Sequence, residues 1–204
     1  MTVRAGIIGA TGAVGQRLIQ LLDPHPDFEI AALTASEDSA GSTYREAAKW
    51  RIDVPIPEDV AEMTVGRTEP EAMPDDVDLV FSSLPSSVGE RVEPAFCEAG
   101  YVVSSNSSNG RLDEDVPLID LIEIQRDERG WDGALVKNPN CSTITMIPPL
   151  AALDAEFGLD RVTVSTLQAV SGAGYSGVTS MEIIDNAIPH IGGEEEKMET
   201  ESRK

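Results

Sequence analysis

A cysteine at position 141 stands in a setting suited to nucleophilic chemistry. It lies within Lys137–Thr143, directly after a strand predicted over Ala134–Val136 and at the start of a predicted helix. A helix N-terminus stabilises a thiolate, and the thiolate is the form that attacks a carbonyl carbon. Asn140 and the neighbouring backbone N–H groups are candidates to stabilise the oxyanion that such an attack creates. The placement favours a catalytic nucleophile, and a buried structural cysteine is the alternative.

The second cysteine, Cys97, has a different setting. It lies in the middle of a helix predicted over Ser87–Ala99, whose apolar face carries Val88, Val92 and Phe96. This pattern is typical of a structural residue. Because the N-terminus shows no secretion signal, we expect both thiols to be free rather than paired.

A candidate partner for the nucleophile is Gln168. It lies near the end of a long strand predicted over Arg161–Val170, and a turn of small residues, Ser171–Gly174, follows it. Such a strand carries an amide towards a nucleophile, while the small residues leave room for a planar ring. An ordinary strand-to-helix connection explains the same pattern equally well.

A glycine-rich turn lies near the N-terminus. Gly9, Gly12 and Gly15 stand between a strand predicted over Val3–Ile8 and a helix predicted over Gly12–Leu22. Glycines in this context let the backbone turn tightly and approach a pyrophosphate, whose charge the helix N-terminus meets. The turn therefore predicts a dinucleotide cofactor, and a purely structural turn is the alternative.

The choice between NAD and NADP depends on the end of the second strand, where the adenosine ribose is read. Glu37 and Asp38 favour the free 2'-hydroxyl of NAD, whereas the hydroxyls of Thr34, Ser36 and Ser39 suit a 2'-phosphate. The sequence leaves both cofactors open.

Strands and helices alternate along the first two thirds of the chain, which predicts an α/β fold with a Rossmann-type, doubly wound parallel sheet. We expect a cofactor-binding domain over residues 1–138 and the beginning of a catalytic and dimerisation α/β domain over residues 139–204. The second domain starts with a helix to Phe157 that Pro148 and Pro149 interrupt or kink. It has too few residues to close a core, so we expect a truncated chain. The predicted strands of the first domain are Val3–Ile8, Phe28–Thr34, Leu79–Ser82, Tyr101–Ser104 and Ala134–Val136.

Composition excludes several classes of function. The 36 acidic and 15 basic residues give a formal net charge of −21, which repels nucleic acid. No apolar run approaches the ~20 residues that span a bilayer, so we expect a cytoplasmic protein without a membrane partner. Only four of the bases are lysines. An acid-rich, lysine-poor surface suggests adaptation to a salt-rich cytoplasm, and an ordinary acidic protein is the alternative. No metal site is predicted.

Taken in order, the motifs resemble the aspartate-semialdehyde dehydrogenase family, and its archaeal-type branch in particular. Any one motif occurs in other reductases, whereas the ordered set is specific. The matching segments are Gly9–Gly15, Ser104–Asn106 with Arg111 and Asp115–Ile119, Asn138–Thr143, Gln168–Gly174 and Ile188–Lys197.

The resemblance implies NADP-dependent reductive dephosphorylation of L-4-aspartyl phosphate to L-aspartate 4-semialdehyde, which feeds lysine, threonine, methionine and isoleucine synthesis. It implies that Cys141 forms the thioester and that Gln168 positions substrate. Arg111 is implied to bind the phosphoryl group, and Glu194 and Lys197 match substrate- and phosphate-binding positions. A homodimer or homotetramer built through the second domain is also implied. The implied cofactor contacts are Gly9, Thr11, Gly12, Ala13, Val14, Gly15, Ser36, Ser39, Ser171 and Gly172.

Three departures limit this comparison. The family's general-base histidine and the arginine that holds the substrate carboxylate come from a later segment, and His25 and His190 match neither. The usual Pro-Glu-Val-Asn stretch after Val116–Ile119 is absent, and Asp120–Glu123 follows at once. Acidic residues also replace the basic residue commonly found in the Ser36–Gly41 turn.

The alternatives that stay open are related acyl reductases and a non-catalytic fragment. N-acetyl-glutamyl-phosphate reductase typically has a Pro-Gly-Cys pattern, which Asn138–Cys141 does not show. Malonyl-CoA reductase is close enough that only a substrate assay separates the two. An inactive dinucleotide-binding fragment is the remaining possibility, because the base is missing.

Overall fold

A computed structural model of the 204-residue chain describes residues 2–118, 133–175 and 177–204. The described residues divide into two compact units. Unit 1 contains residues 2–117 and 133–138, and unit 2 contains residues 118, 139–175 and 177–204. The shortened stretch at Asp120–Glu123 lies outside the described residues.

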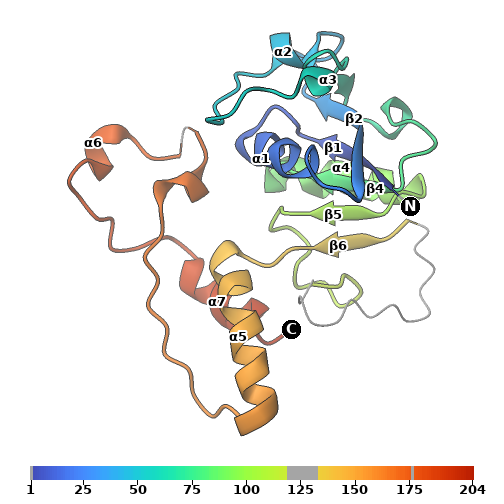
Figure 1. The fold of residues 1–204 in the computed structure, drawn as a ribbon. Coiled ribbons are helices and arrows are strands. Elements are labelled where there is room, and N and C mark those ends of the chain that lie inside the picture. The colour runs from blue at the N-terminus through green and yellow to red at the C-terminus, as the bar shows by residue number, and fades with distance from the viewer. Residues whose placement is uncertain (1, 119–132, 176) are drawn as a thin grey trace. The chain divides into compact units, whose positions relative to one another are not determined.

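Unit 1 is built on a parallel sheet of six strands with the order β3-β2-β1-β4-β5-β6 (Figure 1). This is the strand order of the Rossmann fold, in which the crossovers run outward in both directions from the central first strand. The predicted fold class is thus confirmed. The strands are β1 (Val3–Ile8), β2 (Phe28–Ala35), β3 (Gly66–Arg67), β4 (Leu79–Ser82), β5 (Val103–Ser105) and β6 (Leu135–Lys137).

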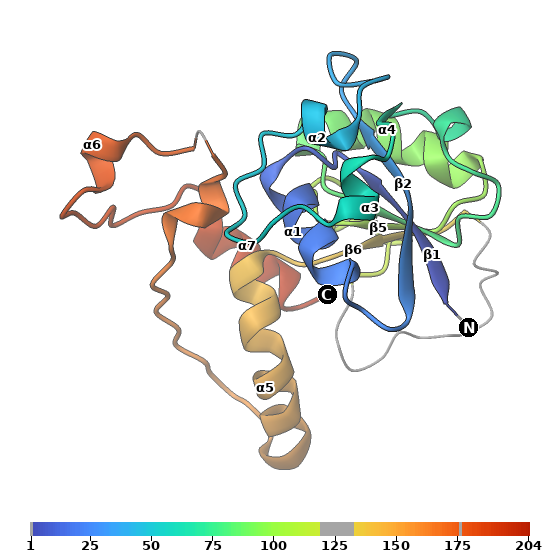
Figure 2. The same ribbon diagram turned by 45° about the horizontal axis from the view of Figure 1, so that its top comes forward.

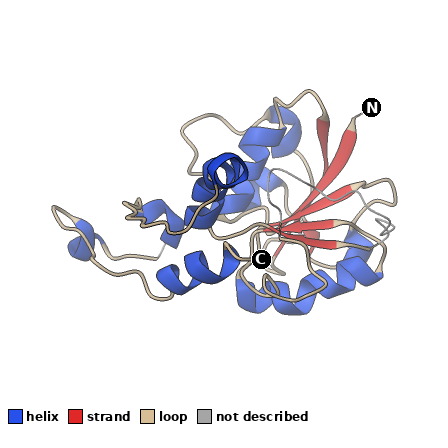
Figure 3. Ribbon diagram, turned by 90° about the horizontal axis from the view of Figure 1, so that it is seen from below, coloured by secondary structure: helices blue, strands red, loops and turns tan. Residues whose placement is uncertain are grey.

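Helices cover the sheet of unit 1 on two faces (Figures 2 and 3). Ile7 and Ile8 are adjacent in β1, so their side chains point to opposite faces. Ile7 packs in one buried cluster with Ile19 of α1, and Ile8 packs in another with Phe96 of α4. The helical elements of this unit are α1 (Ala13–Leu22), α2 (Tyr44–Ala47), α3 (Glu58–Ala61), η1 (Pro70–Ala72) and α4 (Ser86–Glu98).

Three of the predicted strands end one residue later than the sequence pattern suggests. β2 continues to Ala35, β5 to Ser105 and β6 to Lys137. β5 also begins later than predicted, at Val103, because Tyr101 donates its backbone N–H to Phe96 at the end of α4. The carboxyl ends of parallel strands lie at the same edge of a sheet, so these extra residues all belong to the edge where Rossmann folds bind ligands.

A buried carboxylate lies at that edge. Glu93 of α4 is fully buried, and its Oε2 accepts a hydrogen bond of 2.5 Å from Nζ of Lys137, which is also fully buried. The hydroxyls of Ser82 and Ser105 donate to Oε1 at 2.7 and 2.6 Å. The ends of β4, β5 and β6 are therefore tied to one carboxylate on a helix.

The surrounding groups explain how this charge is tolerated inside the protein. Ser107 donates to Glu93 as well, at 3.0 Å, and its oxygen lies 2.8 Å from Nζ of Lys137. A buried ion pair is stable only where hydrogen bonds replace the water that both ions have lost. Burial raises the pKa of Glu93, but the hydrogen bonds from Lys137, Ser105 and Ser82 outweigh this and leave the pKa below its ordinary value.

Unit 2 contains α5 (Cys141–Phe157), η2 (Val170–Ala173), α6 (Ser180–Ile183) and α7 (Glu194–Glu201). α5 and α7 pack against each other (Figure 1). The helix of α5 continues through Pro148 and Pro149, so the predicted interruption is not found.

The strand predicted over Arg161–Val170 is wrong. Residues 161–169 are extended but belong to no strand, and all are exposed, with Leu167 fully so. A strand needs a neighbour that pairs with its N–H and C=O groups. The described part of unit 2 contains no strand, so the Val- and Thr-rich pattern has nothing to pair with.

Replacing Lys137 with Met tests the buried ion pair. The change leaves Glu93 buried without its cation, and loss of one partner of such a pair costs about 3–5 kcal/mol of folding free energy. Urea unfolding followed by circular dichroism measures the loss. The double change Glu93→Gln and Lys137→Met removes both charges and should recover part of the stability. A single variant as stable as the unaltered protein would contradict the account.

Candidate active site

The glycine-rich turn has the geometry that a pyrophosphate requires. Gly9 has a φ of +78°, a region that L side chains rarely adopt, and its backbone N–H donates to Thr34 at 3.0 Å. A Cβ on Gly15 would lie 2.5 Å from the carbonyl oxygen of Gly9, so α1 approaches the turn more closely than any side chain allows. Gly12 caps α1 with no side-chain hydrogen bond, which leaves the first turn of the helix open to an anion.

Two buried side chains that sequence reasoning missed hold this turn in place. The hydroxyl of Tyr44, in α2, donates to the carbonyl of Ala10 at 2.9 Å. The amide of Gln16, in α1, donates to the carbonyl of Thr11 at 3.0 Å. Both side chains are fully buried. The capping box at the start of α2 was a detectable feature of the sequence, but no pattern connected it with the glycines.

The ribose end of the site lies beyond β2. Ser36, Glu37 and Asp38 are exposed there, and Ser39 is half-buried. Thr34 is fully buried and its hydroxyl is hydrogen-bonded to that of Thr68, so it is inaccessible to a cofactor phosphate. The suggestion that Thr34 serves a 2'-phosphate is therefore wrong.

Arg111 lies beyond β5, at the same edge of the sheet. Its side chain is buried, and Nη2 donates to the carbonyl of Asn106 at 2.8 Å. The side chain of Asn106 in turn accepts from the amide of Asn138 at 2.6 Å. Asn138 follows Lys137, so the loop that carries Arg111 is joined to the end of β6 close to the buried ion pair.

Cys141 is the first residue of α5 in unit 2, and it is exposed. Asn140 caps the helix, because its Oδ1 accepts from the backbone N–H groups of Ser142 at 2.8 Å and Thr143 at 3.3 Å. The predicted position of Cys141 at a helix start is confirmed, and the cap residue that produces it precedes the cysteine directly.

The amide of Asn140 makes hydrogen bonds through both its oxygen and its nitrogen. Its Oδ1 caps α5, and its Nδ2 donates to Glu194 at 3.0 Å. In this arrangement Asn140 links the start of α5 to Glu194.

Glu194, the first residue of α7, organises the groups around Cys141. Its side chain is buried, and Oε1 accepts from the hydroxyl of Ser142 at 2.9 Å and from the amide of Gln168 at 2.7 Å. A carboxylate that accepts several hydrogen bonds is stabilised in its ionised form.

Those bonds determine how Glu194 titrates. Burial raises the pKa of its carboxyl, but the hydrogen bond from Gln168 and then that from Ser142 outweigh it, so the pKa lies below the ordinary value. The nearby charge of Lys197 acts in the same direction. Glu194 is therefore a fixed negative charge beside the residues that flank Cys141.

The structure thus brings together four of the predicted residues of unit 2. Cys141 is framed by Asn140 and Ser142, both of which bind Glu194, and Gln168 and Lys197 surround the same carboxylate. The structure shows Ser171 and Gly172 in η2, exposed, and gives no hydrogen bond between them and this group. Among the described residues, no cluster of three or more His, Cys, Asp or Glu has the geometry to hold a metal ion.

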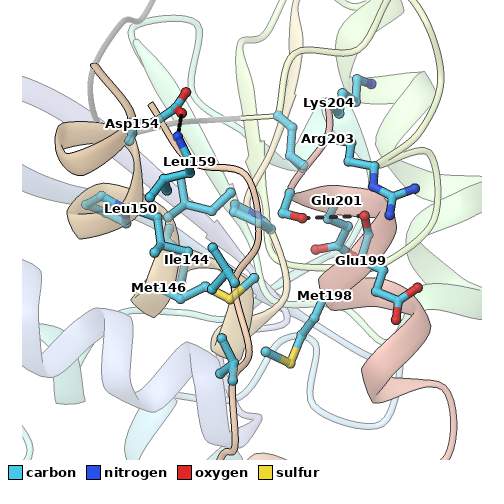
Figure 4. A pocket seen from close by; sticks show the side chains of 18 of the residues that line it. Ile144, Met146, Leu150, Asp154, Leu159, Met198, Glu199, Glu201, Arg203 and Lys204 are labelled. Carbon is cyan, nitrogen blue, oxygen red and sulfur yellow. Dashed lines mark hydrogen bonds between the residues drawn. The ribbon is translucent and has the colours of Figure 1, made fainter. Parts of the chain in front are cut away.

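A separate groove of about 700 Å³, with both apolar and charged lining residues, lies between α5 and α7 (Figure 4). None of the predicted site residues lines this groove, so it is distinct from the group around Glu194. Its walls include Ile144, Met146, Leu150, Leu159 and Met198.

Comparison with known proteins agrees with this geometry. Residues 4–129 match the model of the semialdehyde dehydrogenase NAD binding domain, and residues 150–204 match that of the semialdehyde dehydrogenase dimerisation domain. The chain belongs to the semialdehyde dehydrogenase family. The family resemblance, the α/β fold and the NAD(P)-binding domain expected from the sequence are confirmed.

Individual relatives give the same result. The chain is 53% identical over 98% of its length to the aspartate-semialdehyde dehydrogenase of Methanothermobacter thermautotrophicus, and 45% identical over its whole length to that of Archaeoglobus fulgidus. The crystal structure of the Candida albicans aspartate semialdehyde dehydrogenase with NADP matches the whole chain at a TM-score of 0.86 and 38% identity. The chain spans about 60% of the length of each of these three proteins.

Tyr44→Phe tests the support of the glycine-rich turn. The change removes only the hydroxyl that donates to Ala10, and loss of one buried hydrogen bond costs about 1 kcal/mol. Affinity for NADPH, measured by its fluorescence, should fall several-fold because the turn is less well fixed. Tyr175→Phe, at an exposed position, is the control and should bind as before. Equal affinities in Tyr44→Phe and the control would refute the role.

Gln168→Leu tests the hydrogen bonding of Glu194. Loss of the amide donor should raise the pKa of Glu194 towards its ordinary value, as NMR titration of the side-chain carboxyl would show. In the unaltered chain the lowered pKa of Glu194 stabilises the fold at pH values above the ordinary carboxyl pKa. This contribution is lost as the pH falls through the pKa that Glu194 has in the folded protein. Leu167→Ala, next in the chain and fully exposed, is the control. An unchanged pKa of Glu194 in Gln168→Leu would show that the Gln168 amide does not lower it.

Proposed function

We propose that the chain carries out NADP-dependent reductive dephosphorylation of L-4-aspartyl phosphate to L-aspartate 4-semialdehyde. The observation that carries the proposal is the exposed thiol of Cys141 at the N-terminus of α5, framed by two residues that bind the buried Glu194. The name that the relatives carry, aspartate-semialdehyde dehydrogenase, supports the same aldehyde. Because the chain spans about 60% of their length, the activity is proposed for the residues present here.

In the proposed reaction the Sγ thiolate of Cys141 attacks the acyl carbon of the substrate. The bond between the acyl carbon and the bridging phosphate oxygen breaks, and phosphate leaves with the electron pair. A thioester between the acyl carbon and Sγ of Cys141 remains. The helix N-terminus stabilises the negative charge that develops on the acyl oxygen during the attack. When bound, the reduced nicotinamide supplies the hydride that converts the thioester to the aldehyde, and Cys141 regains its thiolate.

The polar residues have distinct proposed roles. Arg111 binds the phosphoryl group through its planar guanidinium, and Lys197 adds a second positive charge for the same group. Gln168 orients the substrate and the intermediate. Glu194 receives the positively charged amino group of the substrate, a role suited to a carboxylate that stays ionised at neutral pH.

The glycine-rich turn fits a dinucleotide, because a Cβ at Gly15 would fill the space in which the backbone and α1 meet. We propose that Gly9, Thr11, Gly12 and the first turn of α1, Ala13–Gly15, hold the pyrophosphate. Ser36 and Ser39 are proposed at the adenosine ribose. Ser171 and Gly172 are proposed beside the nicotinamide.

We further propose residues 1–138 as the cofactor domain and residues 139–204 as part of the catalytic and dimerisation domain, with assembly as a homodimer or homotetramer. The match of residues 150–204 to a dimerisation domain supports this assembly. No helix among the described residues is long and apolar enough to cross a membrane. We propose that the chain acts in the cytoplasm, in lysine, threonine, methionine and isoleucine synthesis. The formal net charge of −21 supports adaptation to a salt-rich cytoplasm.

Phosphate release tests the acyl-transfer step without requiring the reduction. L-4-aspartyl phosphate added to the chain should release one phosphate per chain in a rapid burst, above its spontaneous hydrolysis. Cys141→Ser should lose the burst. Cys97→Ser is the matched control and should keep it, since Cys97 is half-buried and burial raises its pKa to about 11. A burst that survives in Cys141→Ser would overturn the proposal.

A further inference from the structure

The chain has acidic residues, Glu37 and Asp38, where the ribose of a dinucleotide is read, yet its proposed cofactor is NADP. A 2'-phosphate needs a positive charge nearby, and an arginine is the side chain best suited to it. The stretch from Ser36 to Gly41 contains no basic residue. The structure shows where such a charge is found, on the neighbouring strand β3.

Arg67 is the last residue of β3, and it pairs with Ala35, the last residue of β2. Two hydrogen bonds fix this edge of the sheet beyond the strand pairing itself. The hydroxyl of Thr68 donates to the carbonyl of Ala35 at 2.9 Å. At the far end of the turn, the N–H of Gly41 donates to the carbonyl of Val65 at 2.8 Å. Both ends of the turn are thus attached to the segment that carries Arg67.

The side chain of Arg67 reaches the turn itself. Its Nη1 lies 3.9 Å from Oε1 of Glu37, and both side chains are largely exposed, at 61% and 83%. An ion pair that water and salt screen this strongly is weak. A phosphate monoester carries up to two negative charges and several acceptor oxygens, so it competes effectively with one exposed carboxylate for a guanidinium.

We propose that Arg67 of β3, together with the hydroxyls of Ser36 and Ser39, binds the 2'-phosphate of NADP. The inference rests on the proposed cofactor site, and it assigns the positive charge to a strand that contributes nothing to the glycine-rich turn. Glu37 pairs with Arg67 until the phosphate takes its place. The acidic turn therefore lowers the affinity for NADP without abolishing the preference for it.

Isothermal titration of the 204-residue chain with NADP and with NAD tests the assignment directly, since binding requires no turnover. Arg67→Met should weaken NADP binding by about tenfold, the range expected for loss of a charge-assisted contact, and leave NAD binding within about twofold. Glu37→Gln should tighten NADP binding, because Arg67 is then released from its partner. Raising the salt concentration should reduce the NADP preference of the unaltered chain more than that of Arg67→Met.

Arg45→Met is the matched control. Arg45 is also an exposed arginine of unit 1 that pairs with acidic residues, Glu58 and Glu62, and it should not affect the ratio of the two affinities. An Arg67→Met chain that keeps the full NADP preference overturns the inference while leaving the cofactor site intact. Failure of the unaltered chain to bind either dinucleotide overturns the proposed cofactor function, and this inference with it.

Discussion

The buried carboxylate of Glu93 is the interaction on which unit 1 most depends. A helix of a Rossmann fold usually packs on the sheet through apolar contacts, as α4 does here through Phe96. Glu93 adds hydrogen bonds to the final residues of three strands, Ser82, Ser105 and Lys137. Because an unpaired charge is so costly in this position, the strand ends keep one arrangement, and the loops that follow them start from fixed points.

Those fixed points hold the loops of unit 1 that follow the strands. β5 leads into the loop of Asn106 and Arg111, and Asn138, directly after β6, donates to the side chain of Asn106. Unit 2 repeats the same device with Glu194, whose carboxylate accepts from Asn140, Ser142 and Gln168. In each unit a buried carboxylate with several donors orients residues that lie far apart in the sequence.

The sequence predicted those features that depend on short segments. Gly9, Gly12 and Gly15 define the turn because they stand between a predicted strand and a predicted helix, and the helix predicted to start at Cys141 is α5. It did not predict contacts between distant segments. The predicted strand ends at Val136, whereas Lys137, paired with the buried Glu93, is the last residue of β6. Tyr44 supports the turn across 34 positions of the chain, a relation that no local pattern contains.

The wrong strand at Arg161–Val170 has a related cause. Val and Thr give that segment a high strand propensity, but propensity of this kind reflects packing against neighbouring strands. No such strand exists among the described residues of unit 2, and the segment stays extended and exposed. Local composition thus indicates that the segment can form a strand, whereas a neighbouring strand must be present for it to do so.

The proposed reaction requires that Cys141 becomes acylated by an activated dicarboxylic acid. Peptide mapping by mass spectrometry, after the chain is mixed with L-4-aspartyl phosphate and quenched in acid, tests it most directly. One aspartyl adduct is expected on the peptide that contains Cys141, removed by hydroxylamine as a thioester is, and none on the peptide of Cys97. Phosphate release without an adduct on Cys141, or an adduct on another residue, would contradict it.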